Sequence, residues 1–311
     1  MNQFEYIVTE EDKDLDVKGV LRRKFDFSAR MRTKIKRDKL VYLNGKQTDG
    51  WLPVQPGDVV TIRLPQETSN FIPEDIPISI VYEDGSLLII NKQPGLVVHP
   101  TKGHANHTLA NGIMKYMLDS GQSYKIRFMN RLDMDTSGLV AVAKNSHCQA
   151  SFMKQSQAGL VEKGYLAIVK GLIPSDTGTI DLPIGQPDPE RVERAVTKDG
   201  APSLTHYKVL ERFSAGYSLV ELALETGRTH QIRVHLSHIG YPIVSDHLYG
   251  ETNPFLIERQ ALHAFQLSLS HPVTGKPLQF EAALPDDMEQ LLGQLRGNKS
   301  AVISDHIPPA Y

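Results

Sequence analysis

The sequence predicts an α+β protein in which a small basic α/β module precedes a larger body with a mixed, mostly antiparallel sheet. Three observations lead to this prediction. Positive charge gathers near the start, because residues 18–46 hold eleven Lys and Arg but two Asp, giving +9 in a chain whose net charge is −2. A stretch with Pro65, Pro73 and Pro77 among polar residues follows and shows no periodicity. Beyond it, short apolar strands recur between turn signals.

At 311 residues the chain is long enough for two domains, each with its own core. A Pro-containing segment without apolar periodicity is typical of a linker, and a polar end rich in Gly, Asn, Ser and Pro is typical of a mobile tail. The predicted boundaries are 12–64 for the module, 65–78 for the linker, 79–295 for the body and 296–311 for a flexible tail.

The module begins with two helices in this prediction. Apolar residues between positions 20 and 27 recur at helical spacing, and Ser28 is a suitable N-cap for the second helix. Residues 40–43 then have the composition of a strand, and the following Asn44-Gly45 is a strong signal for a tight hairpin. Residues 54–62 return as a turn and a strand.

The body opens with a predicted hairpin. Strand-like residues 78–82 lead to an Asp84-Gly85 turn, and the apolar run 87–90 follows as the second strand. Alternating strands with few helices favour an α+β body. Further strands are expected at 139–143, 165–169, 205–210, 217–224 and 278–284, with helices around 109–118 and 148–157.

The segment from Arg131 to Gly138, Arg-Leu-Asp-Met-Asp-Thr-Ser-Gly, carries the strongest chemical signal. It sets Asp133 between an arginine and a turn rich in hydroxyl and backbone donors, which can keep a carboxylate ionised for work as a nucleophile or base. The alternative is structural: Asp133 or Asp135 caps a helix, and Gly138 supplies a permissive backbone angle.

A second segment, from Gly227 to His235, alternates two arginines and two histidines with smaller or apolar residues. Its arginines are spaced so that they could present a basic face to an anion while Ile232 and Val234 anchor the segment. An ordinary surface segment with scattered charges is the alternative. The two segments together make coincidence a poor explanation.

With these motifs, the sequence resembles the RluA-type RNA pseudouridine synthases, whose hallmark reads His-Arg-Leu-Asp-x-x-Thr-Ser-Gly. One departure is Asn130, which stands where many members carry histidine. The module resembles the S4-type RNA-binding domain of ribosomal proteins, although Ala29 replaces a frequent arginine. The matching pieces are 130–138, 163–171, 227–235, 262–264 and 271–272, in the family's order, and the resemblance covers roughly 79–290.

The resemblance implies roles for individual residues. Asp133 would be the catalytic carboxylate, Tyr165 would stack on the flipped uracil, and Arg228 would pair with Asp133 to keep it ionised. Arg131 and Arg233 are alternative partners that would otherwise bind backbone phosphates. The remaining predicted RNA-binding residues belong to the module and are Arg22, Arg23, Arg30, Arg32, Lys34, Lys36 and Arg37.

Composition and the implied reaction narrow the partners. No apolar run approaches the ~18 residues of a membrane helix, and the N-terminus lacks the order of a signal peptide, so we expect a cytoplasmic monomer without a membrane partner. Cys148 is the one cysteine, which excludes an intrachain disulfide. Isomerising uridine changes no oxidation state, and the chain has no Walker loop or dinucleotide motif, so we expect no cofactor and no metal.

The sequence thus predicts an RNA uridine isomerase that acts on structured RNA, with 23S ribosomal RNA favoured over transfer RNA. A second hypothesis is a non-catalytic RNA-binding or ribosome-assembly factor, which the intact motif around Asp133 disfavours. A third is a glycosidase, but that chemistry needs two separated carboxylates, and only Asp135 is near.

Overall fold

The structure is a computed structural model that describes residues 3–25, 27–64, 67–101, 103–253 and 256–297. The described residues divide into two compact units. No described helix is both long enough and apolar enough to cross a membrane. The first unit is drawn from Met1–Met134, Gly138–Val161 and Leu267–Phe280, and the second from Asp135–Ser137, Glu162–Gln266 and Glu281–Tyr311.

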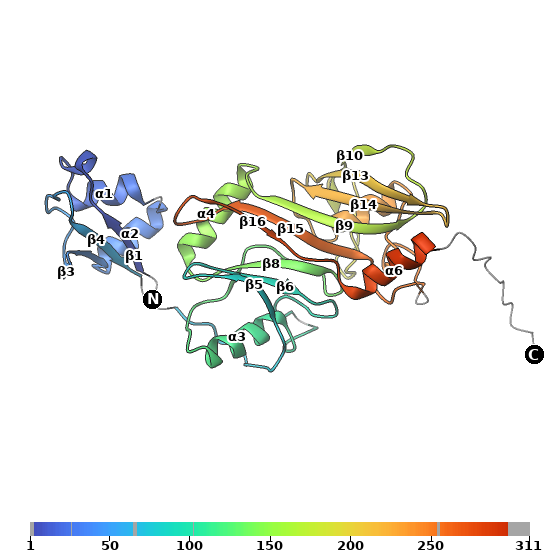
Figure 1. Ribbon diagram of the computed structural model, residues 1–311, viewed down its shortest axis with the longest axis horizontal. Coiled ribbons are helices and arrows are strands. Elements are labelled where there is room, and N and C mark those ends of the chain that lie inside the picture. The colour runs from blue at the N-terminus through green and yellow to red at the C-terminus, as the bar shows by residue number, and fades with distance from the viewer. Residues whose placement is uncertain (1–2, 26, 65–66, 102, 254–255, 298–311) are drawn as a thin grey trace, which may run out of the picture. The chain divides into compact units, whose positions relative to one another are not determined.

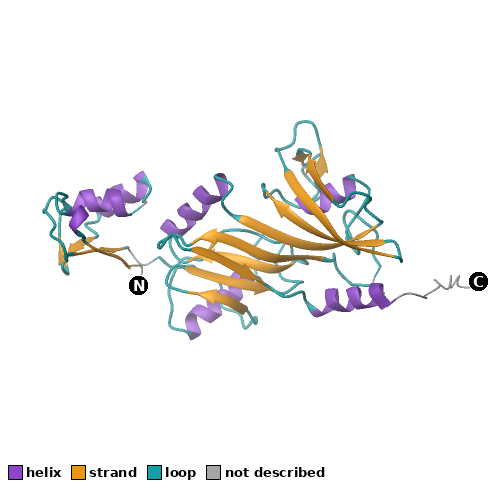
Figure 2. Cartoon of the chain, turned by 45° about the horizontal axis from the view of Figure 1, so that its top comes forward, coloured by secondary structure: helices purple, strands orange, loops and turns teal. Residues whose placement is uncertain are grey.

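The N-terminal part of the first unit is a four-stranded antiparallel sheet in the order β1-β4-β2-β3, with two helices (Figure 1). In Figure 2 the two helices lie on one side of this small sheet. Residues such as Phe4, Val20, Ile35 and Ile62 form its core. The elements are β1 (Gln3–Ile7), a 3-10 turn (Glu10–Asp12), α1 (Val17–Lys24), α2 (Ala29–Arg37), β2 (Val41–Leu43), β3 (Lys46–Gln47) and β4 (Val59–Arg63).

Local signals explain these elements. Ser28 caps α2 as predicted, because its Oγ accepts a hydrogen bond from Met31 N at 3.2 Å. Asn44 and Gly45 have φ of 48° and 79°, which is the backbone of a tight hairpin turn. Strand β1 lies before residue 12, where no strand was predicted, and its Phe4 pairs with Ile62 of β4. The four-stranded sheet therefore begins earlier than the predicted module.

The larger part of the first unit holds a three-stranded arrangement, β5-β6-β8, with antiparallel pairings and β7 beside β8. Strand β6 is almost entirely buried, and its last residue, Lys92, pairs with Gly138 of β8. The predicted Asp84 turn is confirmed: its Oδ1 accepts hydrogen bonds from the backbone N–H groups of Ser86 and Leu87, both at 2.7 Å. The bounds are β5 (Ser79–Glu83), β6 (Leu87–Lys92), α3 (Leu109–Asp119), β7 (Arg127–Phe128), β8 (Ser137–Ala143) and α4 (Ser146–Gln157).

The described linker residues, 67–78, form no helix or strand, but they pack onto the body. Ser69 Oγ accepts a hydrogen bond from Ile126 N at 2.8 Å, and Glu67 pairs with Arg127. Ile76 lies against Gly112 of α3, where an added Cβ would come 3.0 Å from the Ile76 carbonyl oxygen. These contacts hold the described part of the predicted linker against the body.

The second unit is built around the antiparallel strands β10-β13-β14-β9. The α+β class and the dominance of antiparallel pairing are thus confirmed. The bounds of the remaining elements are β9 (Glu162–Lys170), β10 (Thr177–Asp181), β11 (Ile184–Gly185), β12 (Ala195–Val196), β13 (Leu204–Phe213), β14 (Tyr217–Leu224), α5 (Gln231–His238), β15 (Leu262–Ser270), β16 (Pro277–Glu281) and α6 (Asp286–Gly297). The end of β15 and most of β16 belong to the first unit. Among these elements, six were not predicted: β10, β11, β12, α5, the long strand β15 and the C-terminal helix α6.

Candidate active site

Asp133 lies in an irregular turn of the first unit, just before β8. Leu132 beside it is buried, Asp133 is half-buried and Arg131 is exposed. Asn130 ties this turn to β8: its Nδ2 donates to Leu139 O at 2.9 Å, and its Oδ1 accepts from Ala141 N at 2.8 Å. The asparagine that departs from the family pattern therefore uses both ends of its amide to hold the turn.

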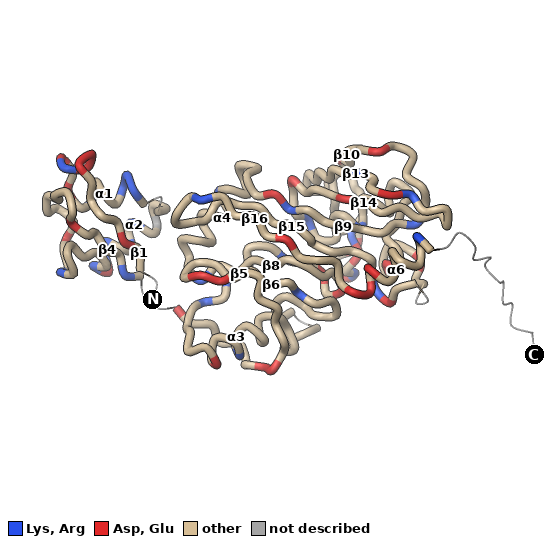
Figure 3. Tube along the Cα trace, viewed as in Figure 1, with Lys and Arg blue, Asp and Glu red and all other residues tan. Residues whose placement is uncertain are grey.

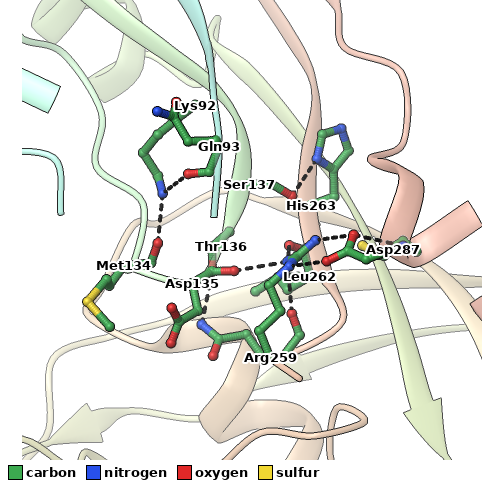
Figure 4. Close-up of polar contacts among 12 residues, drawn as sticks. Lys92, Gln93, Met134, Asp135, Thr136, Ser137, Arg259, Leu262, His263 and Asp287 are labelled. Atoms are coloured by element: carbon green, nitrogen blue, oxygen red, sulfur yellow. Dashed lines mark hydrogen bonds and ion pairs between the residues drawn. The ribbon is translucent and has the colours of Figure 1, made fainter. Parts of the chain in front are cut away.

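A buried lysine fixes the same turn from the other side. Lys92, which is 0% exposed, donates from Nζ to three carbonyl oxygens, those of Gln93, Leu96 and Met134, at 2.8, 2.9 and 2.8 Å. Figure 4 shows the bonds to Gln93 and Met134. Since Met134 directly follows Asp133, the ammonium group restrains the backbone next to the candidate carboxylate. Lys92 was not predicted as a site residue.

Residues 135–137 belong to the second unit, and Arg259 holds the first of them. Its Nη1 donates to Asp135 O at 2.9 Å, while Nε and Nη2 form a bidentate pair with Asp287 at 2.6 and 2.9 Å (Figure 4). Gln260 Nε2 donates to Thr136 Oγ1 at 3.3 Å. A planar guanidinium suits this task because it binds a carboxylate with one edge and a carbonyl with another.

His263, from the predicted Leu-His-Ala motif, supports the same loop. Its Nδ1 lies 2.9 Å from Ser137 Oγ, and its Nε2 lies 3.1 Å from Ala282 O (Figure 4). The carbonyl can only accept, so Nε2 carries the proton and Nδ1 accepts from the serine hydroxyl. Burial lowers the pKa of His263 below its ordinary value. The imidazole therefore acts as a neutral bridge between Ser137 and the chain after β16.

Tyr165 lies on β9, opposite Leu222 of β14, and is 7% exposed. Lys163 is two residues earlier, so both side chains leave the same face of the strand. Burial lowers the pKa of the Lys163 ammonium below its ordinary value. Between them, Gly164 leaves no room for a side chain, since an added Cβ would come 2.9 Å from Phe265 Cε1. Close packing against β15 therefore requires a glycine between Lys163 and Tyr165.

The predicted partner of Asp133, Arg228, is exposed at the entry to α5. Its Nε donates to Pro202 O at 3.2 Å. Gln231 organises this entry: its Oε1 accepts from Arg228 N at 3.0 Å, and its Nε2 donates to Leu204 O at 2.9 Å. His230, the N-cap residue, adopts the left-handed conformation with φ 57°. The motif from Gly227 therefore forms a tight turn that presents Arg228 at the surface.

Arg233 has a different environment. It is 2% exposed, and Asp246, at 0%, accepts from its Nε and Nη2 in a bidentate pair with both distances 2.7 Å. Asp246 also accepts from the backbone N–H groups of Leu248 and Tyr249 at 3.0 and 3.2 Å. A guanidinium enclosed in this way offers no surface to an RNA backbone, so the structure argues against the predicted phosphate contact of Arg233.

The predicted RNA-binding cations of the N-terminal part lie on α1 and α2 (Figure 3). Most are exposed, Lys34 is half-buried, and Arg37 pairs with the neighbouring Asp38 at 2.7 Å. The side chain of Arg30 lies outside the described part of the structure. These residues remain a predicted RNA contact. The exposed members are Arg22, Arg23, Arg32, Lys36 and Arg37.

The predicted catalytic residues are distributed over both units. Asp133 belongs to the first, and Tyr165, Arg228 and Arg233 belong to the second. The pairing of Asp133 with an arginine therefore stays a prediction. Across the described ranges, no group of three or more His, Cys, Asp or Glu side chains is placed to hold a metal ion.

Comparisons with known proteins agree with the sequence motifs. The model of the RNA pseudouridylate synthase family matches residues 86–238. The uncharacterized RNA pseudouridine synthase YlyB of Bacillus subtilis (strain 168) is 42% identical over 303 residues, which cover 96% of this chain and 100% of the relative. Ribosomal large subunit pseudouridine synthase D of Nitrosomonas europaea is 44% identical over 74% of this chain and 69% of its own length. The solved structure of human RNA pseudouridylate synthase domain containing 1 is similar, with a TM-score of 0.54 and 30% identity over 71% of this chain and 95% of its own.

Proposed function

The chain belongs to the RluA-type RNA pseudouridine synthases, and we propose that it isomerises specific uridines of 23S ribosomal RNA with Asp133 as the nucleophile. The observation that carries the substrate is the similarity to several large-subunit pseudouridine synthases D, at 44% identity in one and 40% in another. An appended basic module suits a large folded RNA, because phosphate contacts supply affinity while a pocket reads one flipped base. Such a substrate also favours a cytoplasmic enzyme.

The reaction breaks the bond between ribose carbon 1′ and uracil N1, turns the base and joins ribose to carbon 5. Carbon 5 loses its proton and N1 gains one, so no electrons leave the substrate. Asp133 lies in the turn that Asn130 ties to β8, next to the carbonyl that Lys92 binds, and these contacts support a fixed position for attack. Tyr165 would stack on the uracil ring and exclude water from it.

A nearby cation would stabilise the negative charge of the Asp133 carboxylate. Of the candidate arginines, Arg233 has the burial that this task requires, because an exposed guanidinium is screened by water. Asp246 accepts from Nε and Nη2 of Arg233, and a guanidinium group carries five N–H donors in all. We therefore propose that Arg233, in place of Arg228, pairs with Asp133, and that Arg228 contacts an RNA phosphate.

The nucleophile is tested by Asp133→Asn, which keeps the shape of the side chain and removes its charge. Single-turnover release of tritium from carbon 5 of labelled uridine should disappear, while RNA affinity stays within about twofold. Asp135→Asn is the matched control, because the Asp135 contact described above uses its backbone carbonyl. If Asp133→Asn keeps more than a few per cent of the wild-type rate, the assignment is wrong.

The two arginines are separated by the single-turnover rate at saturating RNA. Losing the cation that pairs with Asp133 removes the charge that stabilises the ionised nucleophile, so the rate falls, whereas losing a phosphate contact weakens binding. We expect a lower rate in the double variant Arg233→Met with Asp246→Leu, which removes the cation without leaving a buried carboxylate unpaired, and weaker binding with an unchanged rate in Arg228→Ala; folding of both variants is checked by circular dichroism. The reverse result would restore the first assignment.

The RNA target is tested by deleting the gene and mapping pseudouridines in ribosomal and transfer RNA. Loss of sites in 23S RNA alone supports the proposal, whereas loss in transfer RNA alone identifies a transfer RNA enzyme. If no site is lost, and the purified protein binds RNA without releasing tritium, the chain is a non-catalytic RNA-binding factor.

A further inference from the structure

The N-terminal part contains a cavity of about 640 Å³ between α1, α2, β2 and the loop at 48–51. This size is within the range of about 300–1,000 Å³ found for small-ligand sites. Its apolar surface comes from Leu21, Phe27, Ile35 and Val41. A cavity that is apolar inside and lies on the most basic part of the chain can accept a flat, uncharged ring attached to an anionic group.

The charged side chains around this cavity are five cations and one carboxylate. Asp49, the carboxylate, lies 3.7 Å from Lys39, so its charge is opposed by a neighbour. Arg32 donates from Nη1 to Phe27 O at 2.6 Å, which fixes its guanidinium at the edge. The excess of positive charge selects an anionic ligand. The five cations are Lys18, Arg22, Arg32, Lys36 and Lys39.

Trp51 completes the cavity and is 63% exposed. Its loop is held against α1, since Lys18 N donates to Gly50 O and Val17 N donates to Leu52 O, both at 3.0 Å. The Lys18 ammonium lies 4.1 Å from the centroid of the indole ring. A large aromatic side chain is thus held at the surface by backbone bonds and accompanied by a cation.

We propose that this cavity binds one unpaired nucleotide of the RNA substrate, with its base stacked on Trp51 and the adjoining phosphates on Arg22 and Lys36. The proposal rests on the proposed function, because it takes RNA as the substrate. An indole face can stack on any base, but only where the base is not already stacked in a duplex, so the ligand is a loop or bulge. Binding at this cavity would make the choice of RNA target depend on the presence of an unpaired nucleotide.

Trp51 is the only tryptophan of the chain, so its fluorescence reports on this cavity alone. The full-length protein is titrated with an RNA hairpin that has an unpaired loop and with a duplex of matched length. We expect the hairpin to quench the fluorescence saturably and the duplex to quench it much less. Trp51→Ala should weaken binding of the hairpin by about 5- to 150-fold.

Two variants define the cause. Trp51→Phe keeps a ring for stacking and should recover most of the affinity, whereas Leu52→Ala, an exposed apolar neighbour outside the cavity, should leave it unchanged. Equal affinity of wild type and Trp51→Ala, or equal quenching by polyglutamate and by RNA, would overturn the proposal. Tritium release by the wild type from labelled, unmodified 23S ribosomal RNA separates the two ideas. Release from that RNA without quenching by the hairpin refutes the cavity proposal alone, and absence of release from it refutes the proposed function.

Discussion

Replacing Lys92 by methionine should destabilise the first unit by about 2–3 kcal/mol. The change removes an ammonium group that satisfies three backbone carbonyls, and each buried acceptor left without a donor costs about 1–3 kcal/mol. The bonds to Gln93 and Met134 are only partly buried, so water can replace some of the loss, and we take the lower figure for each. Relief of the desolvation cost of the lysine offsets a further part.

The prediction is measured by urea unfolding of the full-length protein, followed by circular dichroism. Lys115→Met is the matched control, because Lys115 forms an exposed pair with Asp119 within α3, and exposed pairs contribute little to stability. The single-turnover rate of folded Lys92→Met should also fall, by up to about 100-fold, because the backbone after Asp133 loses its restraint. A loss of stability as small as that of Lys115→Met would refute the reasoning. A normal rate would limit Lys92 to holding the fold.

Burial lowers the pKa of His263 below 6.5, so the folded protein holds this side chain neutral. Its contribution to stability is therefore present above pH 6.5 and is lost as pH falls below that value, by at most about 1.4 kcal/mol per pH unit. His263→Gln should flatten the pH dependence of the urea midpoint between about pH 6.5 and 5. Burial raises the pKa of the Cys148 thiol to about 11, so iodoacetamide at pH 8 should alkylate it slowly in the folded protein and quickly in urea, and equal rates would contradict the burial. Changing Arg22, Arg32 and Lys36 together to glutamine should flatten the plot of log affinity against log salt by about 2, and an unchanged slope would mean that α1 and α2 do not contact phosphate.

Much of the fold could be predicted because its signals are local. Ser28, the Asn44-Gly45 hairpin and the Asp84 turn each act within a few residues, and the structure confirms all three. Helix α6 lies at the end of the predicted body and is not among its predicted helices, although its buried residues have helical spacing: Met288, Leu291, Leu292 and Leu295. Strand β1 is short, and only its pairing with β4 identifies it.

The support of the candidate site could not be predicted in the same way. Lysine is among the residues least often buried, and Lys92 is buried because carbonyls from the residues just after it and from Met134, 42 residues away, converge on its Nζ. The two arginines after Gly227 look alike in sequence, yet one ends at the surface and the other beside Asp246. Their difference arises from the turn at His230 and the start of α5, which no periodicity signals.

The Arg233–Asp246 pair has a consequence for the evolution of the chain. Losing either partner would strand a buried charge at a cost of about 3–5 kcal/mol, a large share of the roughly 5–15 kcal/mol by which most domains are stable. Lysine cannot span both carboxylate oxygens, so even a conservative exchange breaks the bidentate geometry. Single substitutions at these positions would be eliminated by selection for folding alone. Among related chains, invariance of this arginine is therefore no measure of its part in catalysis.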